Sequence, residues 1–438
     1  MQSSDGSWLD LIAAASGGVR GAEISCAIAC ARRSLSYIPE PDDTPLYSEQ
    51  LVAPNRVKKI EVLQLDNLVR QHSLPRLVDS AAFLTSQLPA RLENHISRLE
   101  ALLPTCSSEA LADLISSSAA SKASVLDCSR DWALLQVQDL KGLEHFESHL
   151  SGFRERVEGE MARLMGGAQR LAETAGWWGR EKDVHTLNAA LDLTHWYVLG
   201  LRLMLTQHSA ALNALSSSKG GGARPPLHAP PHAAAAPHPG AGPLVGGAAP
   251  AAGMISRSAS PRRLLQELSE DVRAFCVEKN SAAPDIEVVG GEEVELPLVV
   301  PYASFLFTEV LKNAAQARAL VTRYGAWDVD EADPVKVVIS EPEGDDDHVL
   351  ISITDRGLGV PSDHFSHIFD WFWSSAGKPL IGYGYSRSHG SQMHGLGAGV
   401  PVSRVIAHFM GGSAHWETSL TKLHTTVEIR LPKHGFVF

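Results

Sequence analysis

Residues 349–359 read VLISITDRGLG, a β-branched run that ends in an aspartate and continues into two glycines. The run Val349–Asp355 predicts a strand. Gly357 and Gly359 carry no side chain, so they let a ligand approach the backbone closely. A tight turn after a strand would use the same residues, and the segment alone supports either interpretation.

The sequence around this strand mixes helix and sheet. Val335–Ser340 is a second β-branched run, and the acidic turn Glu341–His348 predicts that the two runs form a hairpin. A helix is expected from about Ser260 to Lys279, opened by a serine cap and a proline. Val400–Met410 predicts another helix, with a proline in its first turn and two glycines after its end. Thr425–Leu431 alternates like a final strand.

A second motif is Glu309-x-x-Lys312-Asn313, in a segment expected to be helical. Glu309 and Asn313 are four residues apart, so they share one helical face and can point a carboxylate and an amide oxygen into one site. Two polar residues on a solvated face give the same spacing, and for an isolated pair that is the more common explanation.

The third motif, residues 394–399, reads HGLGAG and lies just ahead of the helix expected near Val400. Free amide groups and the dipole at a helix N-terminus favour phosphate oxygens, so Gly395, Gly397 and Gly399 predict a loop over phosphates. Other nucleotide-binding schemes are missing from the sequence. It has no Gly-x-x-x-x-Gly-Lys-Ser/Thr loop, no His-Arg-Asp or Asp-Phe-Gly pair, and no Gly-x-Gly-x-x-Gly after a strand.

The first half of the chain has a different pattern. Apolar residues recur three or four apart over residues 74–103, interrupted only by Pro89, and again over residues 146–172 and 184–212. Long amphipathic helices with short joins predict an antiparallel bundle. Pattern alone favours a structural bundle with no chemistry of its own.

Composition separates the halves and limits the function. Residues 216–253 are dominated by Gly, Ala and Pro, which predicts a flexible linker or surface insertion, and the three histidines there reflect composition rather than a metal site. We therefore expect an N-terminal extension (1–45), a helical bundle (46–215), the linker (216–253) and an α/β domain (254–438). The net charge of −12 argues against nucleic acid as a partner. No apolar stretch is long enough for a membrane span.

Taken in order, three motifs and Thr425 on the last strand resemble the ATP-binding domain of the GHKL superfamily, which includes histidine kinases, heat-shock chaperone ATPases, gyrases and mitochondrial dehydrogenase kinases. The resemblance implies an α+β multidomain protein, with the bundle followed by a GHKL-type (Bergerat) α/β sandwich. It also implies that Asn313 holds Mg²⁺, that Asp355 accepts a hydrogen bond from the adenine amino group, and that residues 395–399 cover the phosphates of ATP.

The helical half resembles one branch of that superfamily. LPARLENHISRLEALLP (88–104), DLTHWYVLGLRLMLTQH (192–208) and ISRSASPRRLLQELSEDVRAFC (255–276) are similar to the mitochondrial 2-oxoacid dehydrogenase kinases, which transfer phosphate to serine. QMHGLGAGVPVSRVIAHFMGGS (392–413) is closer to the branched-chain enzyme than to the pyruvate enzymes. Phe305 agrees, because the pyruvate enzymes usually carry a His there. So does the end of the chain at Phe438, where those enzymes continue into a long tail.

The resemblance thus implies an ATP-dependent serine kinase that phosphorylates and inactivates the decarboxylase α subunit of a mitochondrial 2-oxoacid dehydrogenase complex, the branched-chain one ahead of the pyruvate one. Glu309 is the candidate base. The nucleotide site would hold ATP and Mg²⁺ through Lys312, Asn313, Asp355, Gly357, Gly359, Ser374, Ser375, His394, Gly395, Gly397, Gly399, Val400 and Thr425. A K⁺ ion would lie near Ile368, Asp370 and Trp373.

Partners and location also follow from the family. The bundle is expected to bind the lipoyl domain of the transacylase core, and the kinase to form a homodimer in the mitochondrial matrix. The first forty residues carry Arg20, Arg32 and Arg33 among Ser and Ala, as a presequence would, but they also include acidic residues, among them Asp5, Asp10 and Glu23.

Four positions depart from the family pattern. Gln316 stands in place of Arg, Leu358 in place of a glycine, Ala398 in place of an aromatic residue and His424 in place of a glycine. None of them removes a group that must touch metal or adenine. A weakened enzyme and a non-catalytic, ATP-gated binding module both stay open.

Overall fold

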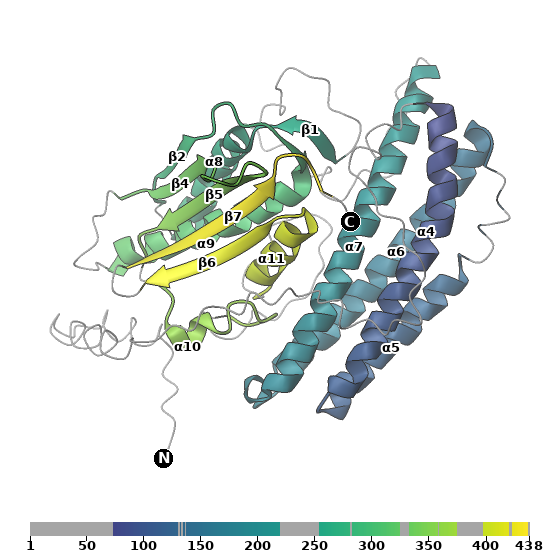
Figure 1. The fold of residues 1–438 in the computed structure, drawn as a ribbon. Coiled ribbons are helices and arrows are strands. Elements are labelled where there is room, and N and C mark those ends of the chain that lie inside the picture. Colours follow the sequence, from purple (N-terminus) through teal and green to yellow (C-terminus); the bar gives the residue numbers. More distant parts are fainter. Residues whose placement is uncertain are drawn as a thin grey trace. The chain divides into compact units, whose positions relative to one another are not determined.

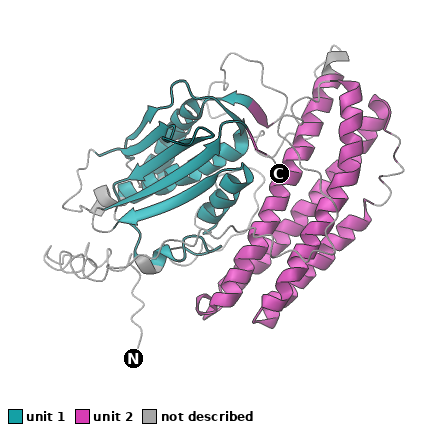
Figure 2. Ribbon diagram, in the orientation of Figure 1, with its two compact units in different colours: residues 1–43, 257–380, 395–434 teal, residues 44–256, 381–394, 435–438 magenta. Residues whose placement is uncertain are grey.

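The computed structural model describes residues 73–129, 132, 135, 137–219, 254–280, 283–324, 333–357, 359–374, 397–419 and 423–436. They belong to two compact units (Figure 2): one takes in residues 257–380 and 395–434, and the other residues 44–256. The expected N-terminal extension and residues 220–253 of the expected linker lie outside the described residues. Residues 216–219, also assigned to the linker, continue a helix.

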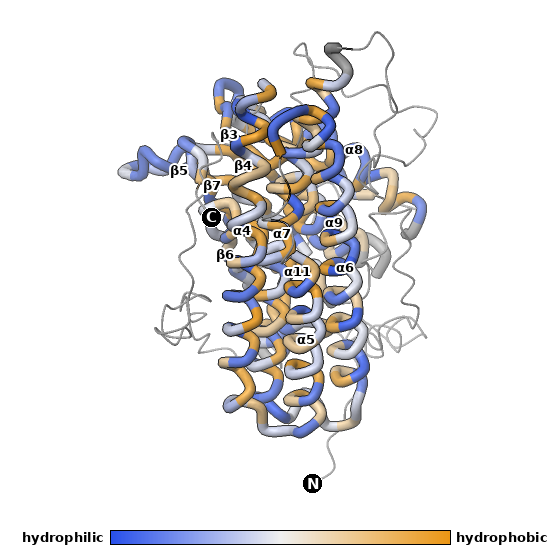
Figure 3. Tube along the Cα trace, turned by 90° about the vertical axis from the view of Figure 1, so that its right-hand side faces the viewer, coloured by the Kyte–Doolittle hydropathy of each residue, from blue (hydrophilic) through white to orange (hydrophobic). Residues whose placement is uncertain are grey.

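The described part of the helical unit contains four long helices. They are α4 (Leu74–Leu102), α5 (Glu109–Asp127), α6 (Leu140–Ala172) and α7 (Glu181–Lys219). Hydrophobic and hydrophilic residues alternate along them (Figure 3), and leucines from every helix are fully buried. This alternation is why the helices pack side by side around a shared core.

Side-chain contacts give the helix directions. Ser80 on α4 lies 3.0 Å from the Nδ1 atom of His208 on α7, while His95 stacks on Tyr197 at 4.9 Å between ring centroids. Numbers rise along α4 as they fall along α7, so the two helices are antiparallel. The expected antiparallel bundle is confirmed.

Two details of the bundle differ from the expectation. Helix α4 continues through Pro89 without a break, because the residues around the proline, including Leu88 and Leu92, are fully buried. Packing of this kind offsets the roughly 3 kcal/mol that a proline costs inside a helix. Helix α5 has no counterpart among the predicted segments, since its sequence is rich in Ser and Ala and its apolar stripe is thin.

The α/β unit is built on a five-stranded sheet of order β2-β4-β5-β7-β6 (Figure 1). Its strands are β2 (Ile286–Gly290), β4 (Val335–Ser340), β5 (His348–Asp355), β6 (Ser413–Ser419) and β7 (His424–Pro432). Strand β2 pairs with β4 in parallel, and the other pairs are antiparallel. Strands β1 (Ile255–Ala259) and β3 (Leu296–Val299) form a separate pair.

Helices α8 (Pro261–Asn280), α9 (Val300–Tyr324) and α11 (Gly399–Phe409) pack on the sheet, and α10 (Ser362–Phe365) is a single turn. The expected strands and helices of this half agree with the structure to within one residue at most ends. Together with the bundle, this confirms the expected α+β fold class. Among the helices that the structure describes, none is long and apolar enough to cross a membrane.

Strand β5 is central, and its pleat decides where the site lies. Val349, Ile351 and Ile353 are buried and alternate with partly exposed residues. Asp355 is two residues beyond Ile353, so it lies on the same buried face. The strand that forms the core therefore also places a carboxylate under the helices.

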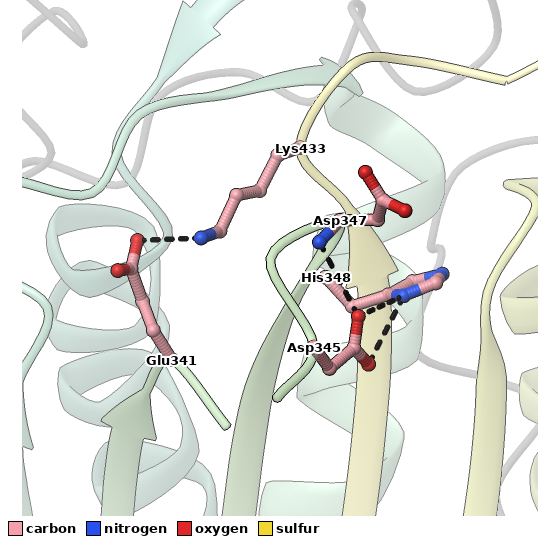
Figure 4. A network of polar contacts seen from close by, with 5 residues as sticks. All are labelled: Glu341, Asp345, Asp347, His348 and Lys433. Atoms are coloured by element: carbon pink, nitrogen blue, oxygen red, sulfur yellow. Dashed lines mark hydrogen bonds and ion pairs between the residues drawn. The ribbon is translucent and has the colours of Figure 1, made fainter. Parts of the chain in front are cut away.

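The acidic turn between β4 and β5 is held by ion pairs (Figure 4). Asp345 accepts from the Nδ1 atom of His348 at 2.9 Å, which lowers the pKa of Asp345. Lys433, just after β7, pairs with Glu341 at 2.9 Å. His348 and Lys433 therefore each partner one carboxylate of the acidic turn. The turn lies at the end of β5 opposite Asp355.

Candidate nucleotide site

Asp355, the last residue of β5, is 5% exposed. Its Oδ1 atom accepts a hydrogen bond from the backbone N–H of Gly357 at 2.8 Å, and the backbone N–H of Thr425 also donates to the carboxylate. Burial raises the pKa of Asp355 to about 7, although these donors and the Arg318 guanidinium act in the opposite direction. A buried carboxylate with a raised pKa is typical of a site that binds a ligand.

The glycines after Asp355 allow close packing. A Cβ atom on Gly357 would come within 2.9 Å of the Ala317 side chain on α9, so only glycine fits between the strand end and this helix. Gly359 has a φ of 73°, a conformation that favours glycine. Val360 then donates its N–H to the hydroxyl of Thr418 on β6 at 2.8 Å, which ties the loop to the sheet.

Glu309 and Lys312 form a buried ion pair on α9. Their exposed fractions are 6% and 4%. A solvated helix face, the alternative explanation for this motif, is therefore wrong for Glu309. Asn313, one turn further along, is exposed, so its amide oxygen is open to a ligand.

The first residue of α11 lies against Glu309. A Cβ atom on Gly399 would come within 2.5 Å of the Oε2 atom of Glu309, so a glycine is needed where the helix meets the carboxylate. Ahead of it, Gly397 has a φ of 65°, and its carbonyl accepts from the N–H of Phe372 at 3.0 Å. Gly397 therefore fixes the approach to α11 by packing against backbone.

Contacts join the three motifs and Thr425, although more than a hundred residues separate Glu309 from Thr425. Glu309 meets Gly399, Gly357 meets α9, and Asp355 is paired with Thr425 across β5 and β7. Two carboxylates and a helix N-terminus thus belong to one connected set of elements in the α/β unit, and the exposed Asn313 lies one turn after Glu309. Such a set suits a ligand with a hydrogen-bond donor at one end and negative charge at the other.

The residues expected around K⁺ lie in one turn between α10 and α11. Asp370 already pairs with the Nδ1 atom of His367 at 2.7 Å, and His367 stacks on Trp373. Ile368 and Ser374 belong to the same segment and are partly exposed. Within the described ranges, no group of three or more His, Cys, Asp or Glu side chains could hold a metal ion.

Some expected residues lie outside the described part of the chain: Ser375, His394, Gly395 and Leu358. Val400 follows Gly399 in the first turn of α11 and is partly exposed. The sequence did not predict Ala317, Arg318 or Thr418. Arg318 follows Glu309 by nine residues on the same helix, but Thr418 is near the site only through the pairing of β6 with β7.

Residues 303–435 match the family model of the histidine kinase-, DNA gyrase B- and HSP90-like ATPases. The mitochondrial pyruvate dehydrogenase (acetyl-transferring) kinase of Arabidopsis thaliana is 25% identical over 349 residues, covering 77% of this chain and 80% of its own. Isozyme 4 from Ictidomys tridecemlineatus is 22% identical, with 87% and 81% covered. The Drosophila melanogaster kinase is 23% identical, with 76% and 72% covered.

The family model covers the elements that carry the site, from α9 to β7, and the kinases resemble the chain over far more residues than the α/β unit contains. The chain therefore combines an ATPase domain of this type with a likeness to mitochondrial pyruvate dehydrogenase kinases over most of its length, which supports a member of the mitochondrial 2-oxoacid dehydrogenase kinase family that acts as a protein kinase.

Proposed function

We propose that the protein is an ATP-dependent serine kinase that phosphorylates and inactivates the decarboxylase α subunit of a mitochondrial 2-oxoacid dehydrogenase complex. The observation that carries the proposal is the buried Asp355 at the end of β5, joined through Thr425 and α9 to the other motifs. The named kinases among the relatives support a dehydrogenase complex as the substrate.

Asp355 would bind the adenine end of ATP. Its carboxylate is an acceptor, and the amino group of adenine is a donor without charge. Gly357 lets the strand end pack closely on α9, because a Cβ atom there would meet Ala317 and the Asp355 carboxylate.

Glu309 would act on the incoming serine. Its carboxylate lies beside the first residue of α11, where free amide groups attract phosphate oxygens, so the base and the phosphate-binding amides are neighbours. Asn313 offers an exposed amide oxygen, the kind of ligand that Mg²⁺ uses together with phosphates. When bound, Mg²⁺ neutralises phosphate charge. Glu309 then needs only to orient the serine hydroxyl and accept its proton.

The choice of complex is a finer question. Residues 392–413 and Phe305 favour the branched-chain complex, whereas the named relatives are pyruvate dehydrogenase kinases. We propose the branched-chain complex first. Equal amounts of the two purified complexes, incubated with the protein and ATP, should differ in the rate at which dehydrogenase activity is lost, and faster loss of pyruvate dehydrogenase activity would reverse this order.

Further parts of the proposal concern the protein's surroundings. We propose that the protein works in the mitochondrial matrix as a homodimer. Its helical bundle would bind the lipoyl domain of the transacylase core. A K⁺ ion would bind near Ile368, Asp370 and Trp373. A reporter fused to residues 1–45 tests the presequence. A reporter that stays in the cytosol would remove the presequence hypothesis.

ATP-dependent inactivation of the purified complex tests the function as a whole. The wild-type protein should inactivate the complex, and Asn313→Ala protein should not, because the proposed Mg²⁺ ligand is missing. A non-catalytic, ATP-gated module gives another result: the protein binds ATP, but the complex keeps its activity.

A further inference from the structure

Two histidines of the helical unit lie one turn apart on α6 (Figure 1). His145 and His149 are four residues apart, so they share one face of the helix. Their ring centres are 4.7 Å apart, and the ring planes are inclined at 73° to each other. His145 is exposed and His149 is partly exposed. The proposed kinase chemistry uses neither of them.

The spacing of the two rings fits a metal chelate. Zinc binds imidazole nitrogen at about 2.0 to 2.1 Å, so two imidazoles at roughly a right angle around one ion have ring centres about 4.5 to 5 Å apart. The observed distance lies in this range. Edge-to-face packing of two aromatic rings gives a similar distance, and the ring nitrogens separate the two explanations.

The Nδ1 atom of His149 lies 3.0 Å from the backbone carbonyl oxygen of His145. A carbonyl oxygen only accepts, so Nδ1 carries the proton, and the neutral ring keeps the lone pair on its Nε2 atom. Metal-binding histidines donate their second ring nitrogen in the same way, which fixes the orientation of the ring. His149 is therefore held in the tautomer that a metal ligand needs.

The surroundings of the pair leave room for an ion. A Cβ atom on Gly152, three residues beyond His149, would meet no atom of a neighbouring element within 4 Å, so this side of α6 is open. Among the described residues, no carboxylate pairs with His145 or His149. Both rings are thus accessible, and no acidic side chain occupies them.

We propose that His145 and His149 form a binding site for a late first-row divalent metal ion, with Zn²⁺ as the expected occupant. Imidazole nitrogen suits Zn²⁺ and Cu²⁺, whereas Mg²⁺ prefers oxygen ligands. Water completes the coordination, because no third His, Cys, Asp or Glu of the described residues joins the pair. The two rings are neighbours only when α6 is helical, so the ion stabilises the folded helix.

Calorimetric titration of the full chain with Zn²⁺ tests the site. His145→Ala and His149→Ala should each weaken it at least about tenfold, because the chelate loses one of its two protein ligands. Alanine is the best helix former, so both variants should fold. The matched control is His185→Ala on α7, since His185 is also exposed and has Glu181 one turn away. It should titrate like the wild type, and weak binding to other histidines cancels in the comparison.

Thermal unfolding gives a second measurement. An ion that binds only the folded helix raises the melting temperature. Zn²⁺ should therefore raise the melting temperature of the wild type and of His185→Ala protein more than that of either α6 variant. The same concentration of Mg²⁺ should give no such difference among the four proteins.

Four outcomes decide the proposal. Loss of one Zn²⁺-binding event in both α6 variants, with His185→Ala unchanged, supports the chelate. Loss in only one of the two variants indicates a contact with a single histidine and overturns it. Identical titrations of the wild type and both variants overturn it as well, and so does a wild-type protein that binds no Zn²⁺.

Discussion

The pKa of Asp355 leads to a prediction about adenosine binding and pH. Burial raises this pKa from 3.8 to about 7. The amino group of adenine is a donor, so it needs the ionised carboxylate as its acceptor. Below about pH 7, the free protein must lose a proton from Asp355 before adenosine can bind. The affinity of the wild-type protein should therefore fall by up to tenfold per pH unit.

The expected size follows from the shift. Between about pH 7 and pH 5 the loss should reach about 2.3 kcal/mol of binding free energy, because the ionised fraction of Asp355 falls roughly 50-fold and each factor of ten corresponds to about 1.36 kcal/mol. Asp355→Asn removes the titrating group. Its affinity should be lower than that of the wild type at about pH 8, by about 1.5 to 3 kcal/mol, the range for a hydrogen bond to a charged group, and should not depend on pH.

Calorimetric titration with adenosine is the assay, since adenosine carries no phosphate that could titrate in this range. Asp345→Asn is a suitable control, because Asp345 is a partly exposed turn residue at the other end of β5. It should follow the wild type at every pH. Equal affinity of wild type and Asp355→Asn, or parallel pH profiles for the two, would refute the role of Asp355.

The same shift affects stability, with the opposite dependence on pH. Because the pKa of Asp355 is raised in the folded protein, the folded state binds more protons than the unfolded chain between about pH 4 and pH 7. The free energy of unfolding therefore falls as the pH rises through this window. In the wild type, Asp355 should account for up to about 4 kcal/mol of this decrease in unfolding free energy, and in Asp355→Asn protein that part of the decrease should be absent. Denaturation of both proteins over a range of pH would measure the difference.

Three further predictions concern other parts of the chain. Glu309→Gln should lower turnover on the decarboxylase by roughly 100- to 10,000-fold, the usual contribution of a positioned base, and full activity would rule out Glu309 as the base. Gly397→Ala should lower the melting temperature more than Gly344→Ala. Both glycines have a positive φ, but of the two only Gly397 would bring a Cβ atom against backbone, at 2.1 Å from the Trp373 carbonyl oxygen. Equal effects of the two substitutions would contradict this prediction. The composition predicts that Gly220–Ala249 is part of a linker. Deleting these residues should leave activity and melting temperature nearly unchanged, because loop length affects stability weakly. A large loss of activity would show that the segment does more than connect the two domains.

Most of the fold could be predicted from periodicity because local patterns agree with the final packing. The β4–β5 hairpin and α11 are examples, where strand runs, turn residues and terminal glycines all lie at the observed ends. Strand β6 could not be predicted. It is paired only along one edge, and its exposed positions include His415 and Glu417, so its sequence lacks a clear apolar run.

The sequence predicts a site residue where that residue type, at that position in the pattern, has few structural explanations. Asp355 at a strand end before glycines, and Glu309 one turn before Asn313, are visible in the sequence. Contacts between elements are not visible there. The packing of Gly357 on Ala317, the position of Arg318, and the contact of Glu309 with Gly399 depend on how α9 crosses the sheet and meets α11.

Transfer of the labelled γ-phosphate of ATP to the serine of a purified decarboxylase α subunit tests the central claim most directly. Wild-type protein should label this serine, and Asn313→Ala protein should not, although both should bind adenosine equally, because Asp355 is intact. Binding of ATP by the wild-type protein without any labelled serine, on either the branched-chain or the pyruvate substrate, would contradict the claim that this protein is a serine kinase of a 2-oxoacid dehydrogenase complex.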